Sequence, residues 1–287
     1  MEDRTVNRRT VLKSGLASLA LTGAGAPPLL AAPKAVLWER WTAHDPASQA
    51  AIDHGLWQAL LQRCLVTGSD GINRFAYAKA AAAAPELDGY LEQMAALPIS
   101  TYSRPEQMAY WINLYNALTV SVVRDHYPVD GIRDIDISPG LFSDGPWGRK
   151  LLTIEQERVA LDDMEHQILR PIWQDPRVHY AVNCASLGCP NLQPVPFTAA
   201  RLDRQLDAAA IEFVNHRRAL ELRGDRLRAS SIYDWFQEDF GGSEQGVIAH
   251  LRAYLLPDLA MKLEGVHAID DYGYDWRLND ASKPTGS

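Results

Sequence analysis

Cysteine and long uninterrupted apolar runs are scarce in this sequence of 287 residues, and the motifs of common cofactor sites are missing. Three cysteines are too few for a disulfide-dense miniprotein. No dinucleotide fingerprint, phosphate-binding loop or Ser-His-Asp nucleophile elbow is present. Hydrophobic residues make up 47% and charged residues 22% of the chain, the usual balance of a globular protein. The composition therefore excludes a disordered chain, a fibre and a polytopic membrane protein, and it predicts no cofactor.

The first 32 residues have the features of an export signal. Arg8 and Arg9 precede a stretch of mostly Leu, Ala and Gly over residues 16–30, and two alanines follow at 31–32. A basic start, an apolar run and a small-residue end are typical of a cleavable secretory signal. The paired arginines indicate the twin-arginine pathway. We therefore predict a signal over residues 1–32, with the export machinery as a transient partner and the periplasm or the exterior as the destination. The alternative is a membrane anchor, but Gly and Pro interrupt a run that is already short for a span.

Negative charge is in excess. The chain carries 28 basic and 36 acidic residues, for a net charge of -8. Removal of residues 1–32 takes away four basic and two acidic residues, which leaves 24 and 34 and a net charge of -10. An acidic surface without a basic run repels phosphate backbones, so nucleic acid is not a predicted partner. A small molecule or a peptide remains as the expected ligand, and no stable membrane span is expected after signal cleavage.

Residues 33–287 alternate between helical periodicity and short strands, which predicts one helix-rich α+β domain with a small mixed or antiparallel sheet. The stretch 128–149 is rich in Gly, Pro and Asp and is predicted to be a long functional loop. Helices are expected over residues 46–66, 73–84, 85–96, 103–126, 162–170, 198–216, 231–240 and 244–263. Strands are expected as hairpins at 151–154 with 158–161 and at 220–222 with 227–229, and singly at 177–183 and 266–269.

The strongest candidate for chemistry is Cys184, at the end of the predicted strand 177–183. A thiolate nucleophile needs a nearby base, usually histidine, and donors for the oxyanion. His179 and His166 are the candidate bases. Side chains alternate along a strand, so His179 and Asn183 would share one face and Cys184 would point the other way. His179 could therefore reach Cys184 only if the turn begins at Asn183.

Three plainer roles compete for this cysteine. Cys184 and Cys189 can close a small disulfide loop in an oxidising compartment. They can also be buried small hydrophobic residues in a structural turn. With His179 they could be three zinc ligands, but no second CxxC or HxxxH completes a known spacing, so no metal site is predicted.

Two helices carry further polar candidates. Asn113 and Asn116 lie three residues apart on one face of an apolar, and therefore buried, helix. Such amides brace a neighbouring loop more readily than they bind substrate. Glu165 and His166 are adjacent, with Arg170 on the face of His166 four residues later. These three form either an ion-pair cluster or part of an active site.

Four motifs together resemble the family called domain of unknown function 547. They occupy residues 110–117, 161–171, 177–190 and 274–279. The resemblance covers most of residues 70–280 and implies an unsettled function in a family whose bacterial members are often exported. It also suggests a similarity to papain- or transglutaminase-like cysteine hydrolases, which place the nucleophile on a buried helix and the histidine on a later strand. Here Asn113 or Asn116 occupies that helix, so either Cys184 replaces the nucleophile or the fold is catalytically silent.

Two hypotheses result. In the first, the chain is a thiol-dependent hydrolase or acyl transferase acting on an amide or ester. In the second, it is a non-catalytic periplasmic binding or scaffold module with a Cys184–Cys189 disulfide. For the first, the nucleophile is Cys184, the base His179 or His166, the orienting group Glu165, the oxyanion donor Asn183 or loop amides, and the further substrate contacts Asn113, Asn116 and Arg170.

Overall fold

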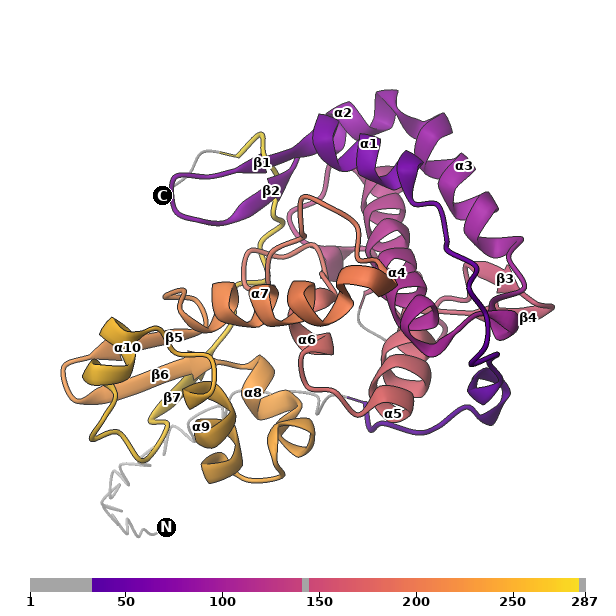
Figure 1. The fold of residues 1–287 in the computed structure, drawn as a ribbon. Helices are drawn as coiled ribbons and strands as arrows, with labels where there is room; N and C mark the ends of the chain where they lie inside the picture. Colours follow the sequence, from indigo (N-terminus) through magenta and orange to yellow (C-terminus); the bar gives the residue numbers. More distant parts are fainter. Residues whose placement is uncertain (1–32, 141–144, 284–287) are drawn as a thin grey trace, which may run out of the picture. The chain divides into compact units, whose positions relative to one another are not determined.

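The computed structural model describes residues 33–140 and 145–283. Helices dominate, and the strands form one three-stranded and two two-stranded sheets (Figure 1). The predicted α+β class is confirmed. The signal predicted for residues 1–32 lies outside the described residues. Across the part of the chain that is described, no helix combines the length and apolar character needed to cross a bilayer.

Helix α4 (Arg104–His126) is the central element of the larger hydrophobic cluster. Every side chain from Glu106 to Val123 is buried, because other elements surround the helix on all sides. Pro105 stands in its first turn, where a missing N–H costs nothing. The predicted helix over 103–126 is therefore confirmed.

The N-terminal region differs from the prediction in its turns. Three helices lie here: α1 (Gly55–Cys64), α2 (Tyr77–Ala82) and α3 (Ala84–Ala95). Between the first two, β1 (Leu65–Thr67) pairs antiparallel with β2 (Asn73–Phe75). The helices predicted over 46–66 and 73–84 are thus too long. Gly68 and Gly71 close a hairpin, with the Gly71 N–H donating to the Gly68 carbonyl at 3.0 Å and Gly71 at φ 76°.

Both predicted hairpins are confirmed. In the first, β3 (Leu152–Ile154) pairs with β4 (Glu157–Val159). In the second, β5 (Leu220–Arg223) pairs with β6 (Arg226–Ser230). The last strand, β7 (Asp271–Gly273), adds parallel to β6, so the strand predicted at 266–269 is wrong. Pairing of β7 with β6 begins at Asp271, which lies opposite Arg228. The preceding residue, Asp270, already donates its N–H to the Leu227 carbonyl at 2.8 Å.

The remaining helices are short. The predicted strand 177–183 is wrong, because residues 178–181 form helix α6; all four of its side chains are buried, so no apolar periodicity marks the turn as helical. The helices predicted over 231–240 and 244–263 are each interrupted. In chain order the remaining α-helices are α5 (Arg170–Trp173), α6 (Val178–Ala181), α7 (Leu202–Val214), α8 (Ile232–Trp235), α9 (Glu244–Arg252) and α10 (Pro257–Lys262). The 3₁₀ helices are Glu39–Thr42, Ile99–Thr101, Ile132–Asp134, Ala199–Arg201 and Gln237–Phe240. Residues Asp163–Leu169, within the helix predicted over 162–170, form a π-helix.

A second hydrophobic cluster lies between α7, the β5–β6–β7 sheet and α9. Tyr180 of α6 is part of it, whereas Val178 and Ala181 belong to the cluster around α4. Helix α6 therefore packs against both clusters, and the loop that follows it begins at their junction. This loop carries Cys184.

Candidate functional site

Buried amides on α4 fix the backbone on both sides of the Cys184 loop. The Asn116 side chain donates to the Ala181 carbonyl at 2.9 Å and accepts from the Asn183 N–H at 2.8 Å. The Asn113 side chain likewise donates to the Phe197 carbonyl at 2.8 Å and accepts from the Phe197 N–H at 3.0 Å. Both amides are thus engaged with backbone groups, which is the use of a structural brace.

Asn183 then shapes the loop itself. Its side-chain nitrogen donates to the Pro190 carbonyl at 2.7 Å, and its side-chain oxygen accepts from the Ala185 N–H at 2.9 Å. Ala185 has a φ of 61°, in the left-handed region that alanine rarely adopts. Both ends of the Asn183 amide are therefore committed to holding a strained turn directly after Cys184.

The segment before the C-terminus closes the loop from the other side. The N–H groups of Leu187 and Gly188 donate to the carbonyls of Arg277 and Asp275, each at 2.8 Å. A Cβ at Gly188 would lie 2.8 Å from the Asp275 nitrogen and 3.0 Å from the Tyr274 ring. Only glycine permits this approach, and the approach brings the Tyr274 hydroxyl to Cys184.

Cys184 is a partly buried residue, and its sulfur lies among polar groups. Its distances are 2.9 Å to the Tyr274 hydroxyl and 3.3 Å to the Ser186 hydroxyl, and Ser186 in turn donates to Tyr274 at 2.8 Å. The N–H of Cys184 donates to the Cys189 sulfur at 2.9 Å, and both thiols are free. Burial acts to raise the pKa of Cys184, but hydrogen bonds from Cys189, Ser186 and Tyr274 outweigh it and lower that pKa. Burial raises the pKa of the Cys189 thiol well above its usual range.

A second polar centre surrounds His179 on α6. Its Nε2 lies 2.7 Å from an oxygen of Asp239, its Nδ1 lies 3.8 Å from Glu165, and its ring stacks on Phe236 with centroids 4.2 Å apart. Arg170 donates from Nε to the same Asp239 oxygen at 2.5 Å. Burial acts to raise the pKa of Asp239, but the bonds from His179 and Arg170 dominate and bring it to about 2. Asp239 is thus a charged anchor for both side chains.

His166 completes this centre as a neutral imidazole. Burial lowers its pKa and so favours the uncharged ring. Arg170 can only donate, and its Nη1 lies 3.1 Å from the His166 Nδ1, so Nδ1 accepts. The ring proton is therefore on Nε2, which faces Asp162 at 3.8 Å. Burial, reinforced by the neighbouring carboxylates of Glu165 and Asp163, raises the pKa of Asp162 to about 6.

Sequence-predicted residues thus fall into two neighbouring centres. Glu165, His166, Arg170 and His179 come together around Asp239. Cys184 lies in the other centre, and the described partners of its sulfur are Ser186, Tyr274 and Cys189 rather than either histidine.

Consecutive aromatic residues link the two centres. Trp235 packs against Tyr274 with centroids 4.9 Å apart, while Phe236 stacks on His179. Burial raises the pKa of Tyr115 of α4, and the Glu165 and Cys184 groups raise it further. Tyr115 therefore lies near both polar centres. The two centres therefore belong to one region of the molecule.

Three members of the site were not singled out from the sequence: Asp239, Ser186 and Tyr274. Asp239 stands in a segment of alternating aromatic and acidic residues, and Tyr274 begins the motif 274–279, so the motifs themselves were the available signal. Across residues 33–140 and 145–283, no group of three or more His, Cys, Asp and Glu side chains is arranged to hold a metal ion.

Residues 99–214 match a family model described as "Protein of unknown function, DUF547". The match supports the resemblance to the DUF547 family over these residues. It runs from the turn before α4 to the end of α7 and so includes Cys184, His179 and the amides of α4, whereas Asp239 and Tyr274 lie beyond it. No curated protein and no solved structure matches the chain.

Proposed function

We propose that this chain is an exported protein of the DUF547 family that uses Cys184 as a thiolate nucleophile to hydrolyse or transfer an acyl group held as an amide or ester. The observation that carries the proposal is the environment of the Cys184 sulfur. Cys184 is a partly buried residue, and the hydroxyl groups of Tyr274 and Ser186 lie within hydrogen-bond distance of its sulfur. Such an environment favours the thiolate, which is the reactive form of cysteine.

The chemistry follows from the charge on sulfur. The Cys184 thiolate attacks the carbonyl carbon, a C–S bond forms, and the negative charge moves to the carbonyl oxygen. Tyr274, no longer needed by the sulfur, can then donate to that oxygen. This assigns the oxyanion role to Tyr274 instead of Asn183, whose amide is used within the loop. Collapse of the tetrahedral adduct breaks the C–N or C–O bond and leaves the acyl group on sulfur as a thioester, while the leaving nitrogen or oxygen takes a proton from solvent water.

Because hydroxyl groups lie against the Cys184 sulfur and favour its thiolate, the proposal does not require a histidine in contact with it. His179, held by Asp239 and Glu165, is instead assigned to the second step, where it removes a proton from the water or acceptor that attacks the thioester. The packing of Trp235 on Tyr274 and of Phe236 on His179 supports this division, since one short segment connects the two centres.

Export rests on the sequence. The pair Arg8–Arg9 and the apolar stretch 16–30 support delivery of the folded protein to the periplasm or exterior through the twin-arginine pathway. Replacing both arginines by lysine should hold the precursor inside the cell. Fractionation of cells that express either form tests this, and equal export of the two forms would contradict the assignment.

The second candidate is a non-catalytic binding or scaffold module with a permanent Cys184–Cys189 disulfide. The contact of 2.9 Å between the Cys184 N–H and the Cys189 sulfur favours it, because it brings the two cysteines side by side. In that case no free thiolate exists and the ion pairs around Asp239 serve only stability.

Iodoacetamide labelling of the purified protein across pH, with the modified residues mapped by mass spectrometry, separates the candidates. Cys184 should label with a midpoint below the value of about 8.5 of a free thiol. Tyr274→Phe should raise that midpoint by about one pH unit, because a hydrogen bond to a charged group is worth about 1.5 kcal/mol or more. Buried Cys64, whose pKa is raised by burial, is the internal control and should stay unlabelled.

Substrate screening follows on the same protein. Activated esters and amides should leave an acyl group on Cys184, seen as added mass, and Cys184→Ser should not retain it as a thioester. A Cys184–Cys189 disulfide that reductant does not open in the folded protein, or a reduced Cys184 that resists iodoacetamide, would rule out the nucleophile and favour the binding module.

A further inference from the structure

The two thiols of the Cys184 loop are adjacent but unequal. Cys184 is half-buried and in contact with two hydroxyl groups, whereas Cys189 is buried and 4% exposed. The Cys184 N–H donates to the Cys189 sulfur at 2.9 Å, which places the two cysteines side by side. A thiol in contact with hydroxyl groups, beside a more deeply buried second thiol, is an arrangement in which oxidation of the first is captured by the second.

The loop suits displacement at oxygen or sulfur. The N–H groups of Cys184, Ala185, Leu187, Gly188 and Cys189 all donate to partners within the protein. A displacement in which a thiolate attacks oxygen or sulfur creates no tetrahedral oxyanion, so it needs none of these donors. Such a displacement therefore requires only a thiolate, a second thiol and a proton source. The Tyr274 and Ser186 hydroxyls can act as the proton source.

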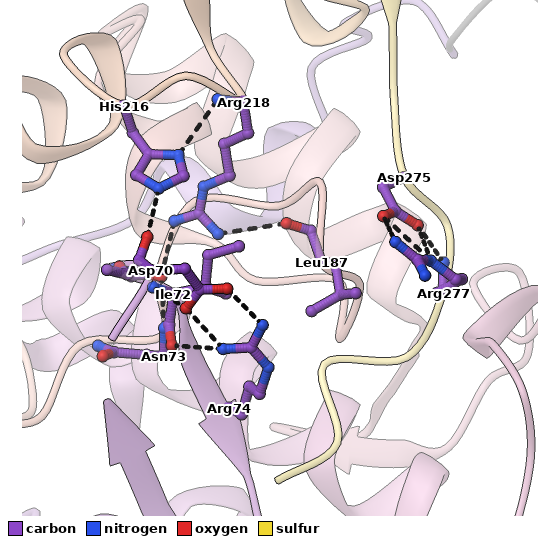
Figure 2. A network of polar contacts seen from close by, with 11 residues as sticks. Asp70, Ile72, Asn73, Arg74, Leu187, His216, Arg218, Asp275 and Arg277 are labelled. Carbon is purple, nitrogen blue, oxygen red and sulfur yellow. Dashed lines mark hydrogen bonds and ion pairs between the residues drawn. The ribbon is translucent and has the colours of Figure 1, made fainter. Parts of the chain in front are cut away.

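Arg218 adds a positive charge on the Cys189 side. Its guanidinium donates to the Leu187 carbonyl at 3.2 Å, as Figure 2 shows. It also donates to the Asn191 side-chain oxygen at 2.7 Å, so it binds the loop on both sides of Cys189. The buried Nε has no hydrogen-bond partner, and no carboxylate bonds to this guanidinium within the described residues. Burial lowers the pKa of Arg218, while Cys189, Glu212, Tyr274 and Asp70 lie close enough to act in the opposite direction. This cation opposes the effect of burial on Cys189 but does not overcome it, since the pKa of the Cys189 thiol is well above its usual range.

We propose that Cys184 and Cys189 form a dithiol centre that reduces a hydroperoxide, with Cys184 as the attacking thiol and Cys189 as the resolving thiol. The Cys184 thiolate attacks the terminal peroxide oxygen, an S–O bond forms, and the O–O bond breaks. The alkoxide or hydroxide that leaves takes a proton and departs as an alcohol or water. The sulfur of Cys184 has then been oxidised to a sulfenic acid, and the peroxide has been reduced.

Cys189 completes the reaction. Its sulfur attacks the Cys184 sulfur, an S–S bond forms, the S–O bond breaks, and hydroxide leaves with the Cys189 proton as water. Two thiols and one hydroperoxide thus yield one disulfide, one alcohol and one water. This reaction shares with the proposed function only the reactive Cys184 thiolate, and the disulfide would block acyl transfer because it consumes the nucleophile.

The test uses the reduced full-length protein and one equivalent of hydrogen peroxide. After denaturation, alkylatable thiols should fall from three to one, with Cys64 the survivor, and mapping should find the Cys184–Cys189 disulfide. Cys189→Ser should stop at the sulfenic acid, which dimedone traps on Cys184. Cys64→Ala is the matched control and should oxidise as fast as the parent.

The outcomes separate this inference from the proposed function. Wild-type protein that oxidises no faster than Cys184→Ser, or a Cys189→Ser variant that yields no dimedone adduct, would overturn the dithiol centre while leaving acylation of Cys184 intact. Rapid disulfide formation in a protein that forms no acyl adduct would support the dithiol centre and reject the acyl chemistry. A Cys184 inert to both iodoacetamide and peroxide would reject both.

Discussion

Replacement of Asp239 by asparagine should be strongly destabilising, because one carboxylate serves two buried partners. Its Oδ2 lies 2.5 Å from the Arg170 Nε and 2.7 Å from the His179 Nε2, and both of those side chains are 2% exposed. Removing one partner of a buried ion pair costs about 3–5 kcal/mol. Asparagine can still accept one hydrogen bond, and Glu238 remains 3.5 Å from Arg170, so we expect a loss near the lower limit, about 3 kcal/mol.

Urea unfolding at pH 7, followed by circular dichroism, measures this loss as a lower midpoint with an unchanged slope. Glu86→Gln is the matched control, since Glu86 pairs with Arg63 at 2.8 Å but the two side chains are 36% and 50% exposed. An exposed pair contributes less than about 1 kcal/mol. An Asp239→Asn variant that loses no more stability than Glu86→Gln would refute the assignment of Asp239 as the anchor of this centre.

The same carboxylate predicts a pH dependence. The pKa of Asp239 is about 2 in the folded protein, against an ordinary value of 3.8. A group whose pKa is depressed by folding contributes stability that is complete above its unfolded pKa and is lost as the pH falls through its folded pKa. The wild type should therefore lose this contribution between about pH 4 and pH 2, and Asp239→Asn should lose less stability over that range.

Two substitutions test how the Cys184 loop is held. Asn116→Ala leaves the Ala181 carbonyl and the Asn183 N–H without their partner and should cost about 2–4 kcal/mol in urea unfolding; a loss below about 0.5 kcal/mol would show that water replaces the amide. Gly188→Ala places a Cβ 3.0 Å from the Tyr274 ring and should displace its hydroxyl from Cys184, which raises the midpoint of iodoacetamide labelling toward about 8.5; an unchanged midpoint would mean that Tyr274 does not stabilise the thiolate.

Local signals in the sequence were sufficient for elements that form from contiguous residues. Helix α4 was predictable because Pro105 starts it and apolar residues continue for several turns. The β3–β4 and β5–β6 hairpins were predictable because turn residues separate two short apolar runs. The buried amides of α4 could likewise be assigned to bracing a loop, since a buried amide needs a partner.

The tertiary structure alone decided which residues contact each reactive group. His179 was a candidate base for Cys184, although the predicted strand would have placed the two side chains on opposite faces. Helix α6 turns His179 toward Asp239, which is 60 residues away. Tyr274 reaches Cys184 across 90 residues of chain because Gly188 lets two backbone segments touch. Spacing along the chain reports on neighbours within one helix or strand, whereas contacts between distant segments depend on how the two hydrophobic clusters pack. The sequence by itself therefore determined which residues could react, and packing determined which of them meet.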